Sequence, residues 1–201
     1  MLPKVSKADL NVSPIDWRGL PRRFMNPGEL EVLVALFRSV SPWVVIEFGC
    51  NEGRTAKVLL REIPTIETYV GIDVERGYVP AKVVQRGEVP DHPGCLVAAD
   101  PLFHLIVKPH GSLDLTAADL LECDAVFIDG DHSRRVVEHD TALARELLRP
   151  GGIIVWHDYH NLKGPDGEPA VDVPAVLNEM AERGADIVHV EGTWLAYQKK
   201  T

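Results

Sequence analysis

Short apolar runs alternate with helical periods along the chain, a pattern typical of an α/β domain with a mostly parallel sheet. The apolar runs predict strands over residues 43–46, 69–74, 95–99, 124–129 and 153–156. Apolar residues three or four positions apart predict helices from Asn26, over 54–62, from Ser133 and over 172–184. Two shorter strands are expected over residues 186–190 and 193–198.

The first 26 residues lack this periodicity. Asn26 can cap a helix, Pro27 suits the first helical position, and Glu29 stands where it can reach back to the cap. We therefore expect residues 1–26 to form an N-terminal arm or lid and residues 27–201 to form one domain. A mobile loop is expected over residues 160–170, which are rich in Gly, Pro and Asp.

Composition and charge argue against nucleic-acid and membrane partners. The 201 residues carry a net charge of −9, and such a field repels phosphate backbones, so we expect no nucleic-acid partner. No stretch approaches the roughly 20 apolar residues that span a bilayer, and no secretory segment is evident. We expect a cytoplasmic protein without a membrane partner. Its three widely spaced cysteines indicate reduced thiols rather than a disulfide framework.

A glycine-containing loop follows the first buried strand and reads Glu47-Phe48-Gly49-Cys50-Asn51-Glu52-Gly53. Glycines at such a strand-to-helix turn let the backbone turn tightly and approach a ligand, and the helix N-terminus behind them offers free N–H groups. Asp73 ends the second strand, 20 residues beyond Gly53, where a carboxylate can accept hydrogen bonds from ribose hydroxyls. Together they predict a nucleotide cofactor.

Two polar clusters follow the fourth and fifth expected strands. The first reads Asp129-Gly130-Asp131-His132 and the second reads His157-Asp158-Tyr159. Ligands bind outside the carboxyl ends of strands in open α/β sheets, so we expect Asp129, His132, His157 and Asp158 to face one cavity. The alternative is that His132 caps a helix and His157 is a satisfied core histidine, with the two carboxylates pointing apart.

These motifs resemble class I methyltransferases that use S-adenosylmethionine (SAM), in the branch with Asp-Gly-Asp-His and His-Asp-Tyr motifs. The family's first motif is matched by Glu47, Gly49 and Gly53, with Asn51 where a glycine is common, and its second acid is matched by Asp73. The resemblance covers roughly residues 27–199. It implies a Rossmann-like, doubly wound, seven-stranded sheet with an antiparallel C-terminal hairpin. The implied cofactor site comprises Glu47, Gly49, Cys50, Asn51, Gly53, Asp73 and, beside the adenine, Asp100.

The resemblance also implies chemistry at the two clusters. We expect methyl transfer to a small hydroxylated acceptor, by O-methylation, with His132 or His157 as the general base and Asp129 or Asp158 orienting it or binding a metal. Some related enzymes hold a divalent metal here, which makes Asp129 and Asp158 candidate ligands for Mg²⁺. His157-Asp158 departs from the usual Asp-Asn or Asp-Asp pair of those relatives.

Two other functions remain as alternatives. A catalytically silent nucleotide-binding or scaffold protein would share the fold, and an NAD(P)-dependent oxidoreductase would share the sheet. The run from Gly49 to Arg54 lacks the Gly-x-Gly-x-x-Gly pattern of the oxidoreductases. The chain carries little insertion to build an acceptor pocket, which leaves open a homodimer that shares one.

Overall fold

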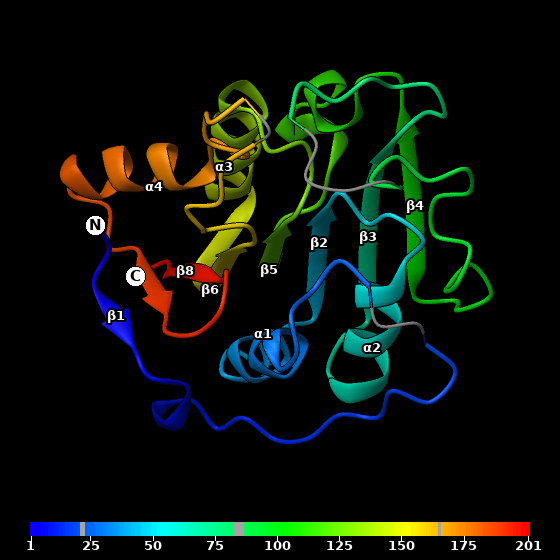
Figure 1. Cartoon of the computed structure of the whole chain (residues 1–201). Helices are drawn as coiled ribbons and strands as arrows, with labels where there is room; N and C mark the ends of the chain where they lie inside the picture. The colour runs from blue at the N-terminus through cyan, green and yellow to red at the C-terminus, as the bar shows by residue number, and fades with distance from the viewer. Residues whose placement is uncertain (21–22, 83–86, 165) are drawn as a thin grey trace.

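The computed structural model describes residues 1–20, 23–82, 87–164 and 166–201. Their eight strands form one sheet in the order β1-β7-β8-β6-β5-β2-β3-β4 (Figure 1). The strands are β1 (Lys4–Val5), β2 (Val44–Phe48), β3 (Thr68–Val74), β4 (Phe103–Lys108), β5 (Cys123–Ile128), β6 (Leu148–Trp156), β7 (Val188–Val190) and β8 (Ala196–Lys199). The only antiparallel pairings among them are those of β8 with β6 and β7.

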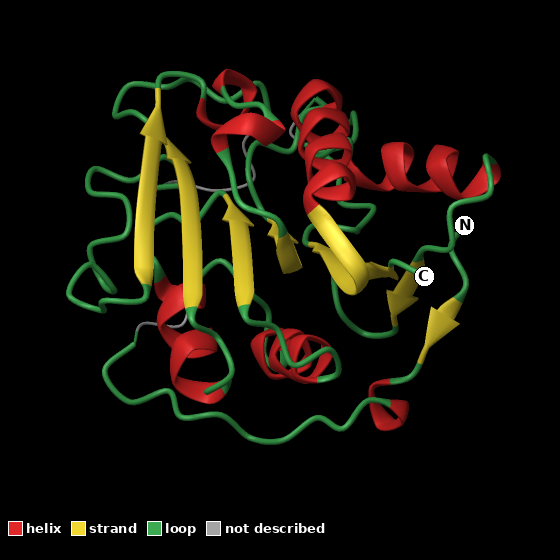
Figure 2. Ribbon diagram, turned by 180° about the vertical axis from the view of Figure 1, so that it is seen from behind, coloured by secondary structure: helices red, strands yellow, loops and turns green. Residues whose placement is uncertain are grey.

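Helices cover both faces of the sheet. On one face α1 (Glu29–Arg38) and α2 (Arg54–Glu62) bury apolar side chains, and on the other α3 (Arg134–Leu147) and α4 (Val173–Glu182) do so. Figure 2 shows this division from behind. Three short 3₁₀ turns complete the elements: η1 (Lys7–Asp9), η2 (Gly111–Asp114) and η3 (Ala117–Asp119). This is the doubly wound, Rossmann-like architecture with an antiparallel hairpin that the sequence predicts.

The central strands are buried on both faces, and this is why the apolar pattern of the sequence predicts them. The side chains of Ile46, Val126 and Ile154 are at most 1% exposed and belong to one core cluster, while Val45, Ala125 and Val155 belong to the other. Since both faces are covered, the strands need continuous apolar runs.

The sheet differs from the expectation at both edges. Residues 95–99 form turns rather than a strand, and the edge strand is β4, where Leu105 is 41% exposed. An edge strand that is half open to water lacks a continuous apolar run, so the apolar pattern of the sequence does not predict β4. At the other edge, Lys4–Val5 of the N-terminal segment pairs with β7 and supplies the eighth strand.

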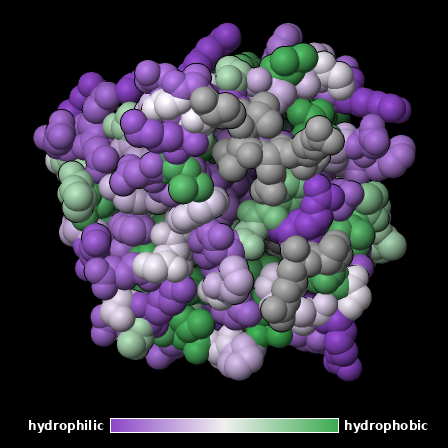
Figure 3. Space-filling view, viewed as in Figure 1, coloured by the Kyte–Doolittle hydropathy of each residue, from purple (hydrophilic) through white to green (hydrophobic). Residues whose placement is uncertain are grey.

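The visible surface is mostly polar. Polar residues dominate the face in Figure 3, and apolar residues appear on it as small separate groups. Within the described parts of the chain, every helix is too short or too polar to cross a membrane.

Candidate functional site

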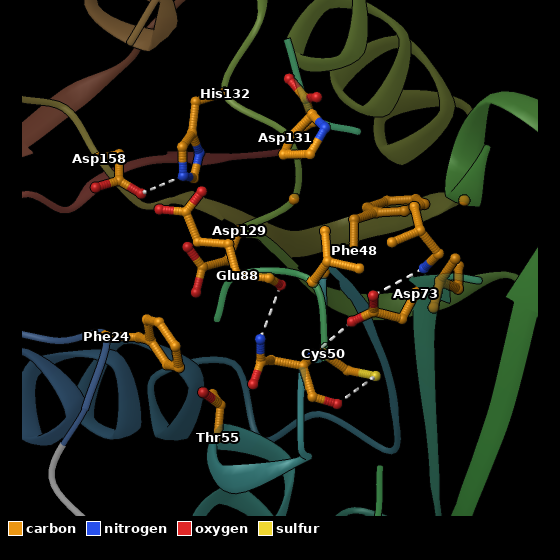
Figure 4. A pocket seen from close by; sticks show the side chains of 18 of the residues that line it. Phe24, Phe48, Cys50, Thr55, Asp73, Glu88, Asp129, Asp131, His132 and Asp158 are labelled. Carbon is orange, nitrogen blue, oxygen red and sulfur yellow. Dashed lines mark hydrogen bonds and ion pairs between the residues drawn. The ribbon is translucent and has the colours of Figure 1, made fainter. Parts of the chain in front are cut away.

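A cavity of about 380 Å³ opens at the carboxyl edge of the sheet. Its lining comes from the ends of β2, β3 and β5, from α2 and α3, and from residues 23–26 of the N-terminal segment. The cavity lies within the size range of small-molecule sites. Figure 4 shows Asp73 on one side of it and Asp129, His132 and Asp158 on the other.

The glycine loop after β2 borders this cavity through Gly49, Cys50 and Asn51. Gly49 has φ +85°, and a Cβ there would clash with the carbonyl oxygen of Asp129. Gly53 has φ +83°, and its Cβ would lie 2.6 Å from Val97 Cγ1. The sequence suggested that these glycines admit a ligand; in the structure they admit neighbouring protein segments, and Gly53 does not border the cavity.

Asp73 ends β3 with its carboxylate at the cavity. Asn51 donates its backbone N–H to Oδ2 at 2.6 Å, and Val74 donates its own to Oδ1 at 2.7 Å. Burial raises the pKa of Asp73 to about 6. The two N–H groups hold both oxygens in place, and each oxygen retains a lone pair for a ligand hydroxyl.

Glu47 and Asp100 do not border the cavity. Glu47 is 1% exposed and accepts a hydrogen bond from the Tyr69 hydroxyl at 2.8 Å, and burial raises its pKa to about 8. Asp100 accepts a hydrogen bond from the Leu102 N–H at 3.0 Å, just before β4. Because β4 runs parallel to β3, this places Asp100 at the amino edge, away from the site. Asp100 therefore does not border the cavity, and the strand expected over 95–99, which would have placed it there, is absent from the described residues.

The two polar clusters converge, as their positions after neighbouring parallel strands require; Ile128 at the end of β5 pairs with Trp156 at the end of β6. His157 Nδ1 lies 3.1 Å from Asp129 Oδ1 and 3.1 Å from Asp158 Oδ2. His132 Nε2 lies 3.5 Å from Asp158 Oδ2 and faces the cavity. The carboxylates thus share a partner and do not point apart.

His157 itself sits behind the cavity and is 3% exposed. Its Nε2 contacts Glu29 Oε2 at 3.2 Å, so carboxylates occupy both ring nitrogens. Burial opposes the charged ring, but Asp158 and Asp129 raise the pKa of His157 well above its usual range. Because carboxylates lie at both of its ring nitrogens and it does not border the cavity, His157 is not placed to take a proton from an acceptor, which leaves His132 as the candidate base.

The carboxylates respond to His157 in different ways. Burial would raise the pKa of Asp158, but attraction to His157 holds it well below its usual range. For Asp129, burial outweighs that attraction and the pKa is raised. The pair therefore combines a firmly ionised carboxylate with one that is reluctant to ionise.

Glu29 is a site residue that the sequence reading assigned only to helix capping. It accepts the Asn26 N–H at 2.6 Å and the Trp194 N–H at 2.6 Å, in addition to its contact with His157. Burial would raise the pKa of Glu29, but the hydrogen bond and charge of His157, together with the hydrogen bonds from Asn26 and Trp194, lower it to about 2. Glu29 thus ties the N-terminal segment to the strand ends, a link that no local pattern encodes.

Asp129, His157 and Asp158 also meet the geometry of a metal site, since one ligand atom from each lies within 4.8 Å of the others. Glu29 on the far nitrogen of His157 is the carboxylate–histidine arrangement that commonly supports a metal ligand. An imidazole among the ligands suits Mn²⁺ or another transition metal better than Mg²⁺.

Arg54 is a second site residue that the sequence does not predict. It opens α2 beside the cavity and is 8% exposed. Its Nη1 donates to the Arg23 carbonyl at 3.0 Å, and its Nη2 lies 3.6 Å from Glu52, whereas Nε has no hydrogen-bond partner. A buried cation with an unused donor favours an anionic ligand group at this end.

Similarity to known proteins is found in sequence and in fold. A family model described as a methyltransferase domain matches residues 46–159. No curated protein matches the sequence.

Several solved structures share the fold at low sequence identity. A cofactor-bound protein from MTB, Rv0187, is 21% identical over 91% of this chain and 85% of its own, with a TM-score of 0.63. The O-methyltransferase TomG from Streptomyces achromogenes, in complex with SAM, is 18% identical over 97% and 94%, with a TM-score of 0.62. An O-methyltransferase from Bacillus cereus, in complex with SAH, is 15% identical over 90% and 84%, with a TM-score of 0.61.

Proposed function

The chain belongs to the family of methyltransferase domains, and from this premise we propose that it transfers the methyl group of SAM to a hydroxyl of a small acceptor. The observation that carries the proposal is one cavity with Asp73 and the glycine loop on one side and Asp129, His132 and Asp158 on the other. Similar folds described as O-methyltransferases in complex with SAM or its product S-adenosylhomocysteine (SAH) support the same assignment.

The cavity supplies the groups that such a cofactor needs. Asp73 would accept hydrogen bonds from the ribose hydroxyls, and Arg54 would bind the carboxylate of the amino-acid tail. Acidic side chains on the far side suit a cationic sulfonium. When bound, SAM supplies an electrophilic methyl group.

The protein must then position the acceptor and remove its proton. His132 would take the proton, and Asp158, 3.5 Å from its Nε2, would stabilise the resulting imidazolium. Trp17, Met25 and Trp194 border the same cavity and would hold the apolar body of the acceptor. Phe24 also borders the cavity, which favours a lid role for the end of the N-terminal segment; its start belongs to the sheet through Lys4 and Val5.

Asp129, Asp158 and His157 would hold a divalent cation if one is used. Such a cation would act as a Lewis acid and lower the pKa of a bound hydroxyl. His132 keeps its role in either case, because it lies outside this ligand set.

Two variants test the cofactor assignment. Asp73→Asn should lose roughly 10-fold in SAH affinity, because a charged acceptor is removed from the ribose. Asp100→Asn is the matched control and should bind SAH like wild type, since Asp100 lies away from the cavity. Equal SAH affinities of the two variants, measured by calorimetry, would refute the ribose assignment.

Turnover is tested separately. Wild-type protein, SAM and a panel of small phenols and catechols should give SAH and a methyl ether, identified by mass spectrometry. Methylation only of amines would overturn the O-methyl assignment. Tight SAH binding with no turnover of any acceptor would instead favour the silent nucleotide-binding alternative.

A further inference from the structure

His160 is a buried polar side chain that the proposed function leaves without a role. It comes directly after the second cluster, and its side chain is 3% exposed. It does not border the cavity, so it cannot touch a bound acceptor. Its Nε2 is buried and has no hydrogen-bond partner among the described residues, while Asp158 Oδ1 lies 3.4 Å from it. Buried donors are rarely left unpaired, so this nitrogen needs an acceptor.

The loop after His160 fixes which ring nitrogen carries the hydrogen. Leu162 donates its backbone N–H to Nδ1 of His160 at 3.1 Å. An imidazole whose Nδ1 accepts a hydrogen bond carries its hydrogen on Nε2, the nitrogen that faces Asp158. Leu162 is itself held in place, because Ala170 donates its N–H to the Leu162 carbonyl at 3.0 Å. The loop therefore presents a donor to the Asp158 carboxylate.

Histidines surround Asp158 at both carboxylate oxygens. Oδ2 lies 3.1 Å from His157 Nδ1 and 3.5 Å from His132 Nε2, a pair drawn in Figure 4, and Oδ1 faces His160. The backbone of Asp158 has φ +58°, a left-handed conformation that is strained in a residue with a side chain. Rotation of the carboxyl group would move Oδ2 away from His132, and a donor at Oδ1 opposes that rotation.

We infer that His160 is a positioning residue for methyl transfer: it donates its Nε2–H to Asp158 Oδ1 and so keeps Oδ2 directed at His132. This role rests on the proposed function, which makes His132 the base. Hydrogen bonds around a catalytic group are often long without ligands and tighten when substrate binds, in keeping with the 3.4 Å found here. The alternative is packing alone, because the rings of His160 and Trp194 lie 4.1 Å apart and Trp194 borders the cavity.

Two substitutions separate the donor from the ring. His160→Phe keeps a ring against Trp194 but has no donor, whereas His160→Gln loses the ring but can place an amide N–H near the position of Nε2. Steady-state kinetics use SAM and the phenol or catechol that wild type methylates fastest. His160→Phe should lower kcat roughly 10- to 100-fold at an unchanged KM for SAM. His160→Gln should keep most of the wild-type kcat.

The control is His92→Phe, the same change at an exposed histidine, which should keep wild-type kinetics. A packing role predicts the reverse order, with His160→Phe active and His160→Gln impaired, and that order would overturn the positioning role. Equal kcat values of the two variants, high or low, would also overturn it, while the activity of wild type leaves the proposed function standing. If wild type methylates no acceptor, the proposed function fails and the positioning role fails with it.

A measurement on wild type covers the case in which circular dichroism shows that a variant does not fold. In long-range ¹H–¹⁵N spectra of labelled wild type, Nδ1 of His160 should resonate as a nitrogen without hydrogen and Nε2 as an N–H. Hydrogen found on Nδ1 would overturn the positioning role whatever the kinetics.

Discussion

Replacing Glu47 with glutamine should make the free energy of unfolding less sensitive to pH. Glu47 is 1% exposed, and its pKa in the folded protein is raised from 4.5 to about 8. A raised carboxyl pKa means that the folded state is favoured while the group is protonated. That contribution is fully present below the pKa of the unfolded chain and is lost as the pH rises towards 8.

The size of the effect follows from the shift. One pKa unit corresponds to about 1.4 kcal/mol, so ionisable Glu47 should cost wild type about 3 kcal/mol between pH 5 and pH 8. Glutamine does not titrate, and its amide oxygen can still accept the Tyr69 hydroxyl. The unfolding free energy of Glu47→Gln minus that of wild type should therefore rise by about 3 kcal/mol over this range.

Urea unfolding at several pH values measures this difference, with the exposed Glu67→Gln as the control for removing one carboxylate. A difference that stays constant from pH 5 to pH 8 would refute the buried-acid reasoning. SAH affinity serves as a second readout. Because Glu47 does not border the cavity, that affinity should stay close to wild type, whereas a direct cofactor ligand would lose it.

Three further outcomes are expected. His132→Gln should lower kcat by roughly 10²–10⁴ while SAH affinity is kept, because only proton removal is lost; an unchanged kcat in stopped assays would exclude His132 as the base. Gly49→Ala should destabilise the fold by at least about 2 kcal/mol, because the position has φ +85° and its Cβ would clash with Asp129; thermal unfolding at the wild-type Tm would contradict this. Dialysis against a chelator should reduce turnover, and Mn²⁺ should restore it better than Mg²⁺ because His157 would be one of the ligands; full activity after complete metal removal, verified by elemental analysis, would exclude a metal in catalysis.

The convergence of the two clusters could be predicted because it depends on chain order and strand geometry. Residues 124–129 and 153–156 read as buried strands joined by one helix, and such strands are neighbours with their carboxyl ends on one edge. Asp129 and Asp158 then lie close together whatever the details of side-chain packing.

Other parts of the site depend on contacts between segments far apart in the sequence. Glu29 reaches His157 and Trp194, and Asp140 reaches the turn at Ser112. Neither contact can be predicted from the neighbouring residues. An acid near the start of a helix is interpreted as a cap, and an acid within a helix is interpreted as part of its solvent-exposed face. Asp100 was misplaced for a related reason, because the half-exposed edge strand beyond it carries no apolar run.

The central claim is that one cavity holds the cofactor with its sulfur facing the second cluster. A crystal structure of the protein with SAH tests it directly. We expect the ribose hydroxyls on the Asp73 carboxylate, and the sulfur directed towards the space between Asp129, His132 and Asp158. SAH bound elsewhere, or bound with its sulfur directed away from these three residues, would contradict the account.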